Sequence, residues 1–483
     1  MIGFVSMVFC GHLGKTELAG VALAIAIINV TGLSIGSGLS SACDTLISQT
    51  YGSGNFKHVG VILQRSILIL LLSCFPCWAV LINTEAILLA VRQSAEVARL
   101  AQLYVKIFMP ALPAVFMYQL QGRYLQNQGI IWPQVISGAI GNVFNVITNY
   151  VFLHVLKLGV EGSGAANTIS QFSLTVILFL YIYIGKLHKA TWDGWSMECL
   201  REWGQFLSLA LPSMIMMCSE WWLYEVASFL AGVISEVELG AQSIVYELAI
   251  IVYMIPVGFS IAASVRVGTA LGAGNIEQAR VATKVSLGCT VVVSCITAIV
   301  LGSSGNVIAY IFTSEREIIE RVALVMKFYG LVHISEAFAG CMYGIVRGSG
   351  KQKIAAVGIF IFYYFVGFPV GVSMMFPLKF GIIGLWIGFL ISALGICIFF
   401  AIYFCKFNWK NAMEEAQGRV GGVSGKDGVV TLQQEASQTS AATSLSVKQL
   451  VVRRSFTVLF MIVILAAGVF ISELLVNVLQ LEN

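Results

Sequence analysis

Residues 37–55 read SGLSSACDTLISQTYGSGN, and residues 257–275 read VGFSIAASVRVGTALGAGN. The two stretches share small residues at matching positions and end in the same Gly-x-Gly-Asn pattern. The match continues along the chain at a nearly constant offset, for example from Gly162 to Gly384. A repeat of this length indicates two equivalent structural units. We therefore predict two lobes with the same order of elements.

Long apolar segments fill both repeats. Hydrophobic residues make up 58% of the 483 residues, and charged residues only 11%, against about 25% in soluble domains. A helix that crosses a bilayer needs about 20 mostly apolar residues. Such helices are expected at residues 21–48, 59–82, 102–122, 134–155, 163–185, 204–231, 238–265, 283–304, 322–346, 354–376, 382–404 and 455–478. The sequence thus predicts an all-α polytopic membrane protein.

The repeat divides these helices into two six-helix lobes, which are parallel repeats because each holds an even number of helices. The predicted parts are an N-terminal lobe at 1–185, an inter-lobe cytoplasmic linker at 186–203, a C-terminal lobe at 204–404, a partly disordered cytoplasmic linker at 405–454, disordered within 411–447, and an extra transmembrane helix at 455–483. Only residues 1–16 precede Glu17, whereas the whole span 204–231 precedes its counterpart Glu238. Residues 1–10 are therefore expected to be the tail of a first helix that is truncated.

Basic residues are unevenly distributed between the predicted loops. Most of the 28 Lys and Arg residues lie in or beside the loops on one side of the bundle. The positive-inside rule places that side in the cytoplasm. The Gly-rich loops at 52–55 and 272–275 are then both cytoplasmic.

Acidic residues inside predicted spans are the clearest functional signal. Glu220 and Glu225 lie in CSEWWLYEVASFL (218–230), Glu247 lies in the next span, and Glu336 lies in LVHISEAFAG further on. A carboxylate inside an apolar span costs about 2.5–3.5 kcal/mol on insertion scales, so it usually has a function. It can hold either a proton or a cation, and competition between the two is antiport. The alternative is that these acids only form hydrogen bonds between helices.

Aromatic and polar side chains accompany the acids. Trp221, Tyr224, Tyr246 and Tyr253 are candidate substrate-binding residues, because an aromatic face attracts an organic cation by about 0.5–2 kcal/mol. Asn29 is the best polar candidate in the first lobe, although a hydrogen bond between helices is an equal alternative. His333 lies one turn before Glu336 and is either a packing residue or a proton relay.

Other chemistry has little support in the sequence. A disulfide between Cys10 and Cys74 would form if both reach an oxidising outer face. The cysteines inside apolar spans are expected to be buried thiols, namely Cys43, Cys218, Cys289, Cys295, Cys341 and Cys397. The chain has no metal motif, no nucleophile motif and no basic run for nucleic acid. We therefore expect no enzyme, no cofactor beyond the proton as coupling ion, and a monomeric protein whose partners are small organic cations and membrane lipid.

The sequence closely resembles the animal multidrug and toxin extrusion (MATE) proteins of the solute carrier 47 type. The motifs that carry this resemblance are VFCGHLGK, SSACDTLISQTYG, HVGVILQRS, FPCW, EWWLYEV, ELGAQSIVYELAIIVYM, ASVRVG, LGAG and RGSG. They imply two six-helix lobes around a central cavity that opens alternately to the two faces. By resemblance, the family's functional acids fall on Glu220, Glu225, Glu247 and Glu336, and its cavity-lining positions fall on Trp221, Tyr224, Tyr246, Tyr253 and Asn29.

The resemblance also implies a function and a location. It predicts export of hydrophilic organic cations, such as tetraethylammonium, biguanides, creatinine and thiamine, in exchange for protons. It predicts the plasma membrane, apical in epithelia. Alternatives are a lipid or oligosaccharide flippase of the same superfamily and an uncoupled channel or receptor. The truncated first helix departs from the family pattern.

Overall fold

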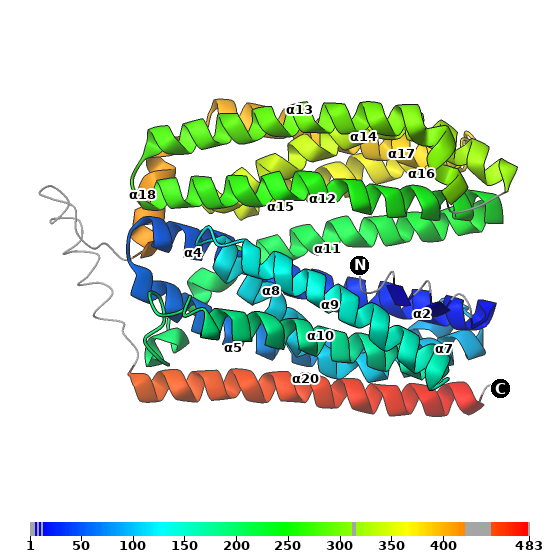
Figure 1. Ribbon diagram of the computed structural model, residues 1–483, viewed down its shortest axis with the longest axis horizontal. Helices are drawn as coiled ribbons and strands as arrows, with labels where there is room; N and C mark the ends of the chain where they lie inside the picture. The colour runs from blue at the N-terminus through cyan, green and yellow to red at the C-terminus, as the bar shows by residue number, and fades with distance from the viewer. Residues whose placement is uncertain (1–4, 7–8, 11–12, 312–314, 421–445, 482–483) are drawn as a thin grey trace, which may run out of the picture. The chain divides into compact units, whose positions relative to one another are not determined.

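The computed structural model describes residues 5–6, 9–10, 13–311, 315–420 and 446–481. The expected stump at residues 1–10 therefore lies largely outside the described residues, as does most of the predicted disordered segment. The described chain is almost entirely helical (Figure 1). Twelve of its helical segments are long and apolar enough to cross a membrane, and each overlaps one predicted span. The predicted fold class is confirmed.

The chain divides into two compact units. Unit 1 comprises Met1–Cys43, Asn55–Phe206 and Gly421–Asn483, and unit 2 comprises Asp44–Gly54 and Leu207–Val420. The division follows the repeat with two differences. Residues 44–54 pack with the second repeat, and the extra C-terminal helix packs with the first.

Unit 1 is a helical bundle that includes short π-helical and 3-10 segments, labelled η. Its elements are α2 (Lys15–Ile28), η1 (Asn29–Leu33), α3 (Ser34–Ser40), α5 (Phe56–Leu81), α6 (Thr84–Ala90), α7 (Ala95–Phe108), η2 (Met109–Ala111), α8 (Leu112–Gln126), α9 (Trp132–Tyr150), η3 (Val151–Val155), α10 (Gly159–Ile184), η4 (Met197–Leu200) and α20 (Val447–Leu481). Helix α4 (Ala42–Gly52) begins in unit 1 and continues in unit 2.

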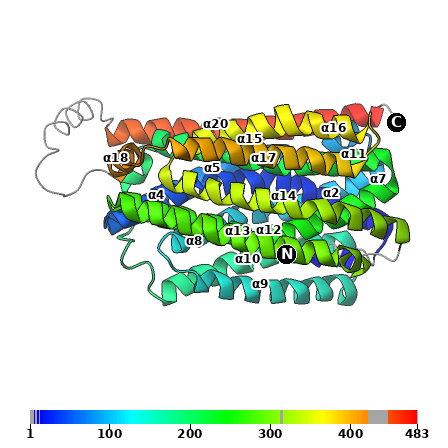
Figure 2. The same ribbon diagram turned by 90° about the horizontal axis from the view of Figure 1, so that it is seen from above.

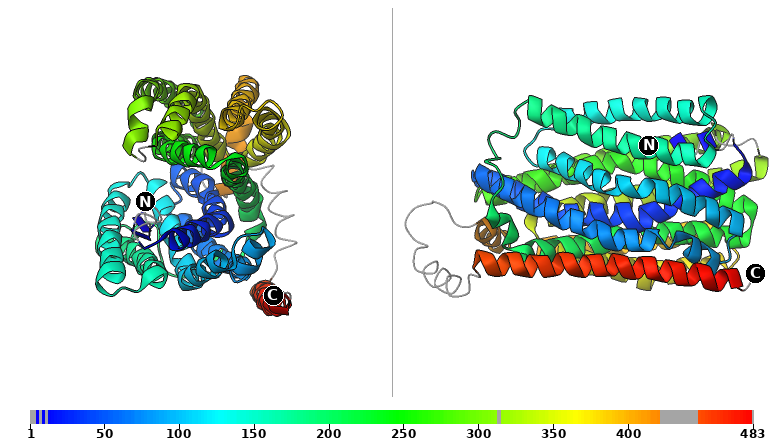
Figure 3. Two further views of the ribbon diagram at one scale, coloured as in Figure 1. Left: turned by 90° about the vertical axis from the view of Figure 1, so that its right-hand side faces the viewer. Right: turned by 90° about the horizontal axis from the view of Figure 1, so that it is seen from below.

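The extra helix α20 packs along α5 at the edge of unit 1 (Figure 3). Gly468 allows close approach there, because a Cβ at this position would lie 2.7 Å from Ala79 Cβ. The Asn83 side chain donates to the Gly468 carbonyl at 3.0 Å. At the other end, the Arg454 guanidinium lies 4.0 Å from the centre of the Trp203 ring. These contacts fix α20 along its length.

Unit 2 contains the longest helices. Its elements are α11 (Trp203–Ile234), α12 (Glu236–Gly272), α13 (Ile276–Ile308), η5 (Ala309–Ile311), α14 (Arg316–Ser349), α15 (Gln352–Phe360), η6 (Ile361–Gly367), α16 (Phe368–Met375), α17 (Ile382–Cys405) and α18 (Trp409–Val420). Helices α12, α13 and α14 pack side by side (Figure 2). Unit 2 contains every predicted acid.

Glycines bring α12 and α14 into close contact. A Cβ on Gly344 would lie 2.0 Å from the Ser260 carbonyl oxygen, and one on Gly348 would lie 2.5 Å from that of Ser264. Small residues four apart allow two helix backbones to approach in this way inside a membrane. The approach holds the C-terminal parts of the two helices together.

The prediction of disorder from residue 411 is wrong for residues 411–420, which belong to helix α18. Ala412 and Ala416 are one turn apart and fully buried, so the short helix has an apolar face that packs on unit 2. Arg419 pairs with Glu415 at 3.2 Å and donates to Gln49 Oε1 at 3.1 Å. Burial lowers the pKa of the Arg419 guanidinium, and the Glu415 carboxylate opposes that shift. The polar composition concealed this small buried face.

Candidate functional site

The four predicted acids come from three helices of unit 2. Helix α11 carries Glu220 and Glu225, α12 carries Glu247, and α14 carries Glu336. These helices are long, apolar and free of interior breaks apart from single prolines at Pro212 in α11 and Pro256 in α12. Helices α12 and α14 pack closely on each other, and all four acids lie on helices rather than on loops. A site on such rigid elements is held accurately.

Glu336 is the most deeply placed of the four, with 8% of its surface exposed. The Tyr224 hydroxyl donates a hydrogen bond to Glu336 Oε1. Glu220 is half-buried, and its carboxylate is close enough to Glu336 for their charges to repel. Glu220 and Glu336 thus form a pair of acids linked to a tyrosine.

Tyr224 also belongs to an aromatic cluster. Its ring stacks on Tyr246 with centroids 5.6 Å apart and planes at 20°, and lies 5.0 Å from Phe389. Trp386 meets Phe389 edge-on at 5.4 Å. Its Nε1 donates to Gln242 Oε1 at 2.9 Å. The cluster thus packs several aromatic rings against the ring of Tyr224.

Four further tyrosines surround the Glu220–Glu336 pair. Tyr253, Tyr329, Tyr343 and Tyr363 each lie close enough to one or both acids to interact with their charge. The hydroxyls of Tyr329 and Tyr343 are buried and have no hydrogen-bond partner among the described residues. A buried hydroxyl without a partner is costly. The site therefore offers spare donors and acceptors next to two acids.

Glu225 and Glu247 form a second pair. Their charges interact with each other and with Tyr246, and both side chains are half-buried. Among the described residues, no tyrosine hydroxyl donates a hydrogen bond to Glu225 or Glu247. The four predicted acids thus form two pairs. Tyr246, which interacts with the second pair, stacks on Tyr224, whose hydroxyl donates to the first pair.

The other predicted residues are placed as follows. Trp221 is half-buried on α11, next to Glu220. Asn29 is half-buried in unit 1, at the first position of the π-helical turn η1. His333 is fully buried, with its ring 6.1 Å from that of Tyr329. Neither nitrogen of His333 has a hydrogen-bond partner within the described part of the chain, so its role as a relay stays a prediction.

The predicted disulfide between Cys10 and Cys74 is not formed. Both are free thiols, and both are buried in unit 1. The Cys74 thiol donates instead to the Leu70 carbonyl of its own helix at 3.5 Å. Both thiols are buried inside the unit and unpaired with each other, so the conditional prediction of a disulfide is not borne out.

Arg347 is a site residue that the sequence analysis did not identify. It was counted only as a loop charge, but its side chain is buried on α14. It pairs with Asp44 at 3.4 Å and donates to Ser260 Oγ at 2.9 Å. Its charge also acts on Glu220 and on Tyr253. The charge of Arg347 therefore reaches the first acid pair.

Tyr329 and Tyr343 were also missed, although the sequence contains a signal for them. Each is seven residues from Glu336, one before and one after. Residues seven apart share one face of a helix, so the three side chains line a single face of α14.

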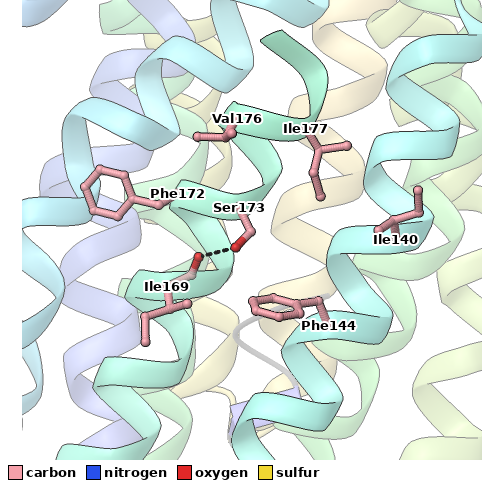
Figure 4. Close-up of a pocket in the computed structure, with 7 residues that line it drawn as sticks. All are labelled: Ile140, Phe144, Ile169, Phe172, Ser173, Val176 and Ile177. Carbon is pink, nitrogen blue, oxygen red and sulfur yellow. Dashed lines mark hydrogen bonds between the residues drawn. The ribbon is translucent and has the colours of Figure 1, made fainter. Parts of the chain in front are cut away.

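Two other features have no role in this chemistry. Among the described residues, no group of three or more His, Cys, Asp or Glu side chains could hold a metal ion. An apolar groove in unit 1 lies between α9 and α10, with Phe144, Phe172 and Ile169 among its walls (Figure 4). It provides a serine but no acid, so it offers no counter-charge to a cation.

Twelve membrane-length helices in two units, with acids buried among tyrosines in one of them, define an integral membrane protein of the transporter type. The sequence model of the MatE family matches residues 1–151 and 212–373. The chain belongs to the multidrug and toxin extrusion (MATE) family. It is a transporter of that type and not an enzyme.

Individual relatives support the assignment. The chain is 60% identical to multidrug and toxin extrusion protein 1 of Danio rerio, over 99% of this chain and 88% of that protein. It is 58% identical to the Homo sapiens protein of that name, over 86% of this chain and 73% of that one. The crystal structure of the eukaryotic MATE transporter AtDTX14 aligns with a TM-score of 0.83 and 30% identity, over 87% of this chain and 94% of that one.

Proposed function

We propose that this chain exports organic cations in exchange for protons, with the Glu220–Glu336 pair as the site where the two compete. The observation that carries the proposal is the contact of Tyr224 with Glu336, beside a second acid. Two like charges in a buried site repel each other, so the pair favours holding one proton or one cation over holding neither. That competition couples proton entry to cation exit.

The aromatic cluster supports an organic cation as substrate. The stacked rings of Tyr224 and Tyr246 lie between the two acid pairs. A ring face attracts a cation by about 2 kcal/mol when both are desolvated. Trp221 and Tyr253 would extend this surface, and Asn29 would contribute from the first repeat. The relatives' names, multidrug and toxin extrusion protein, are consistent with varied organic substrates.

Coupling would follow alternating access. A proton reaches the Glu220–Glu336 pair from one face of the membrane, and a cation reaches it from the other. The pair is open to only one face at a time. Glu225 and Glu247 would act as a second cation site that is less deeply buried. By its resemblance to the animal proteins, the chain would work in the plasma membrane, at the apical face of epithelial cells.

The test is uptake of radiolabelled tetraethylammonium into cells that express the full chain, after an outward proton gradient is imposed. We expect uptake that follows the gradient and is lost in Glu220→Gln at equal surface abundance. Glu317→Gln is the matched control, because Glu317 is exposed on the first turn of α14. Normal exchange by Glu220→Gln would overturn the proposed site. Uptake without a matching proton flux would indicate an uncoupled channel.

A further inference from the structure

A basic pocket lies where α13 begins, α17 ends and α18 begins. Its volume is about 370 Å³, and its walls are Arg280, Thr283 and Lys284 of α13, Phe404 of α17 and Trp409 of α18. All three elements belong to unit 2. The pocket shares no residue with the two acid pairs.

The pocket has a net positive charge. Arg280 and Lys284 are one helical turn apart, and both are exposed. Arg280 forms an ion pair with Glu277 at 3.0 Å. Lys284 has no ion-pair partner among the described residues. Glu277 offsets only one of the two positive charges, so the pocket can attract an anion.

The remaining walls are aromatic. Phe404 and Trp409 both pack on Phe407, which lies 5.4 Å from the first ring and 4.8 Å from the second. Rings of this kind concentrate at the level of lipid headgroups. Exposed Lys406 and Lys410 lie beside these rings in sequence. The pocket thus combines the two residue types that mark the interface between membrane and water.

An exposed apolar surface begins directly beside the pocket. On α13, Val285 follows Lys284 and is 57% exposed, and Val292 lies two turns further along at 60%. On α17, Ile402 precedes Phe404 and is 57% exposed, and Ile398 lies one turn earlier at 60%. Side chains that remain this exposed on membrane-spanning helices face lipid chains. A ligand in the pocket would continue along these helices.

We propose that this pocket binds the headgroup of an anionic phospholipid, with its acyl chains against the exposed faces of α13 and α17. Basic pockets between transmembrane helices bind anionic headgroups in this way. The phosphate would lie against Arg280 and Lys284, and the glycerol region against Trp409. The loop charges predict that this end of unit 2 faces the cytoplasm, where anionic lipids are enriched. The site is independent of the proposed exchange reaction.

The test is native mass spectrometry of the purified full chain in detergent, titrated with phosphatidylserine or phosphatidylcholine. We expect the first phosphatidylserine to bind about tenfold more tightly than phosphatidylcholine. Arg280→Gln with Lys284→Gln is expected to remove that preference. Lys186→Gln with Lys189→Gln is the matched control, because these exposed residues lie outside the pocket and remove the same charge.

Three results would overturn the proposal. The first is equal binding of the two lipids by the unaltered chain. The second is a preference that survives Arg280→Gln with Lys284→Gln. The third is full displacement of phosphatidylserine by an equal concentration of inorganic phosphate, which would make this a site for free anions. If the double variant does not purify as a monodisperse protein, the single variant Lys284→Gln takes its place. We expect its affinity for phosphatidylserine to fall by about fivefold, and an unchanged affinity would overturn the proposal.

Discussion

The two repeats have the same helix order but opposite chemistry in their interiors. In unit 1, a buried network of amides and hydroxyls is centred on Asn167, which accepts from Ser6 Oγ at 2.7 Å and from Asn145 Nδ2 at 3.0 Å. Asn167 also donates to the Tyr104 hydroxyl. In unit 2, the corresponding interior holds carboxylates among tyrosines. A neutral network can bind helices together, but it carries no charge to exchange.

This difference is the reason for placing the proposed exchange of proton and cation in unit 2. Asn149 and Ser163 join the unit 1 network through further hydrogen bonds, and each partner in it is uncharged. The hydroxyls of Tyr329 and Tyr343 beside the acids of unit 2 have no described partner. We therefore expect the unit 1 network to serve mainly stability, and we place the proposed exchange of proton and cation in unit 2.

The largest effect is expected from Glu336→Gln. The substitution keeps the size of the side chain and an acceptor for Tyr224, but it removes the charge that a proton or cation would neutralise. We expect exchange of tetraethylammonium to fall by about 100-fold or more, because glutamine at this position cannot alternate between a charged and a neutral form. Uptake in cells, normalised to surface protein, measures this. Exchange within a few-fold of the unaltered chain would show that the charge of Glu336 is not needed. The proposed contrast between an exchanging unit 2 and a structural unit 1 would then fail.

A smaller effect is expected from Tyr224→Phe. The ring still stacks on Tyr246, but the donor to Glu336 is gone. A hydrogen bond to a charged group contributes about 1.5–3 kcal/mol, so we expect exchange to fall by roughly tenfold. Tyr364→Phe is the control, because its hydroxyl donates to the Ser219 carbonyl and not to an acid. Equal losses in the two variants would argue against a special role for the Tyr224 hydroxyl.

Glu225→Gln tests the second acid pair. Glu225 and Glu247 are half-buried, so solvent screens the loss of one charge. We expect the concentration of tetraethylammonium at half-maximal uptake to rise by roughly threefold, with little change in maximal rate. Concentration-dependent uptake separates these quantities. A collapse of the maximal rate would instead place the coupling step at this pair.

Asn167→Ala tests the opposite half of the comparison. It removes the centre of the unit 1 network and leaves its partners unpaired, which costs about 1–3 kcal/mol of stability. We expect a lower melting temperature of the purified protein but exchange per folded molecule within about twofold. Asn142→Ala is the control, because within the described part of the chain Asn142 bonds only to the Gly138 carbonyl of its own helix turn. Loss of exchange by well-folded Asn167→Ala would give unit 1 a part in the chemistry.

Much of the fold could be predicted because its signals are local. The twelve spans followed from apolar length, and the repeat followed from matching glycines. The four acids were found because a carboxylate in an apolar span is costly. The helix of residues 409–420 was missed because its buried face consists of little more than two alanines and a valine, too small to stand out in a polar segment.

The details of the site could not be predicted, because they depend on contacts between distant residues. Tyr224 and Glu336 lie 112 positions apart, and Arg347 and Asp44 lie 303 apart. No periodicity in one sequence pairs such residues. Only Tyr329 and Tyr343 had a local signal, their seven-residue spacing from Glu336.

Proton release on substrate binding tests the role of the Glu220–Glu336 pair most directly. The purified full chain is mixed with tetraethylammonium in weakly buffered detergent solution, and a pH indicator records protons that leave the protein. Competition at the acid pair predicts release of roughly one proton per bound cation and none in Glu336→Gln, with release unchanged in Glu317→Gln. Binding without proton release, or equal release from Glu336→Gln, would contradict the exchange site described for unit 2.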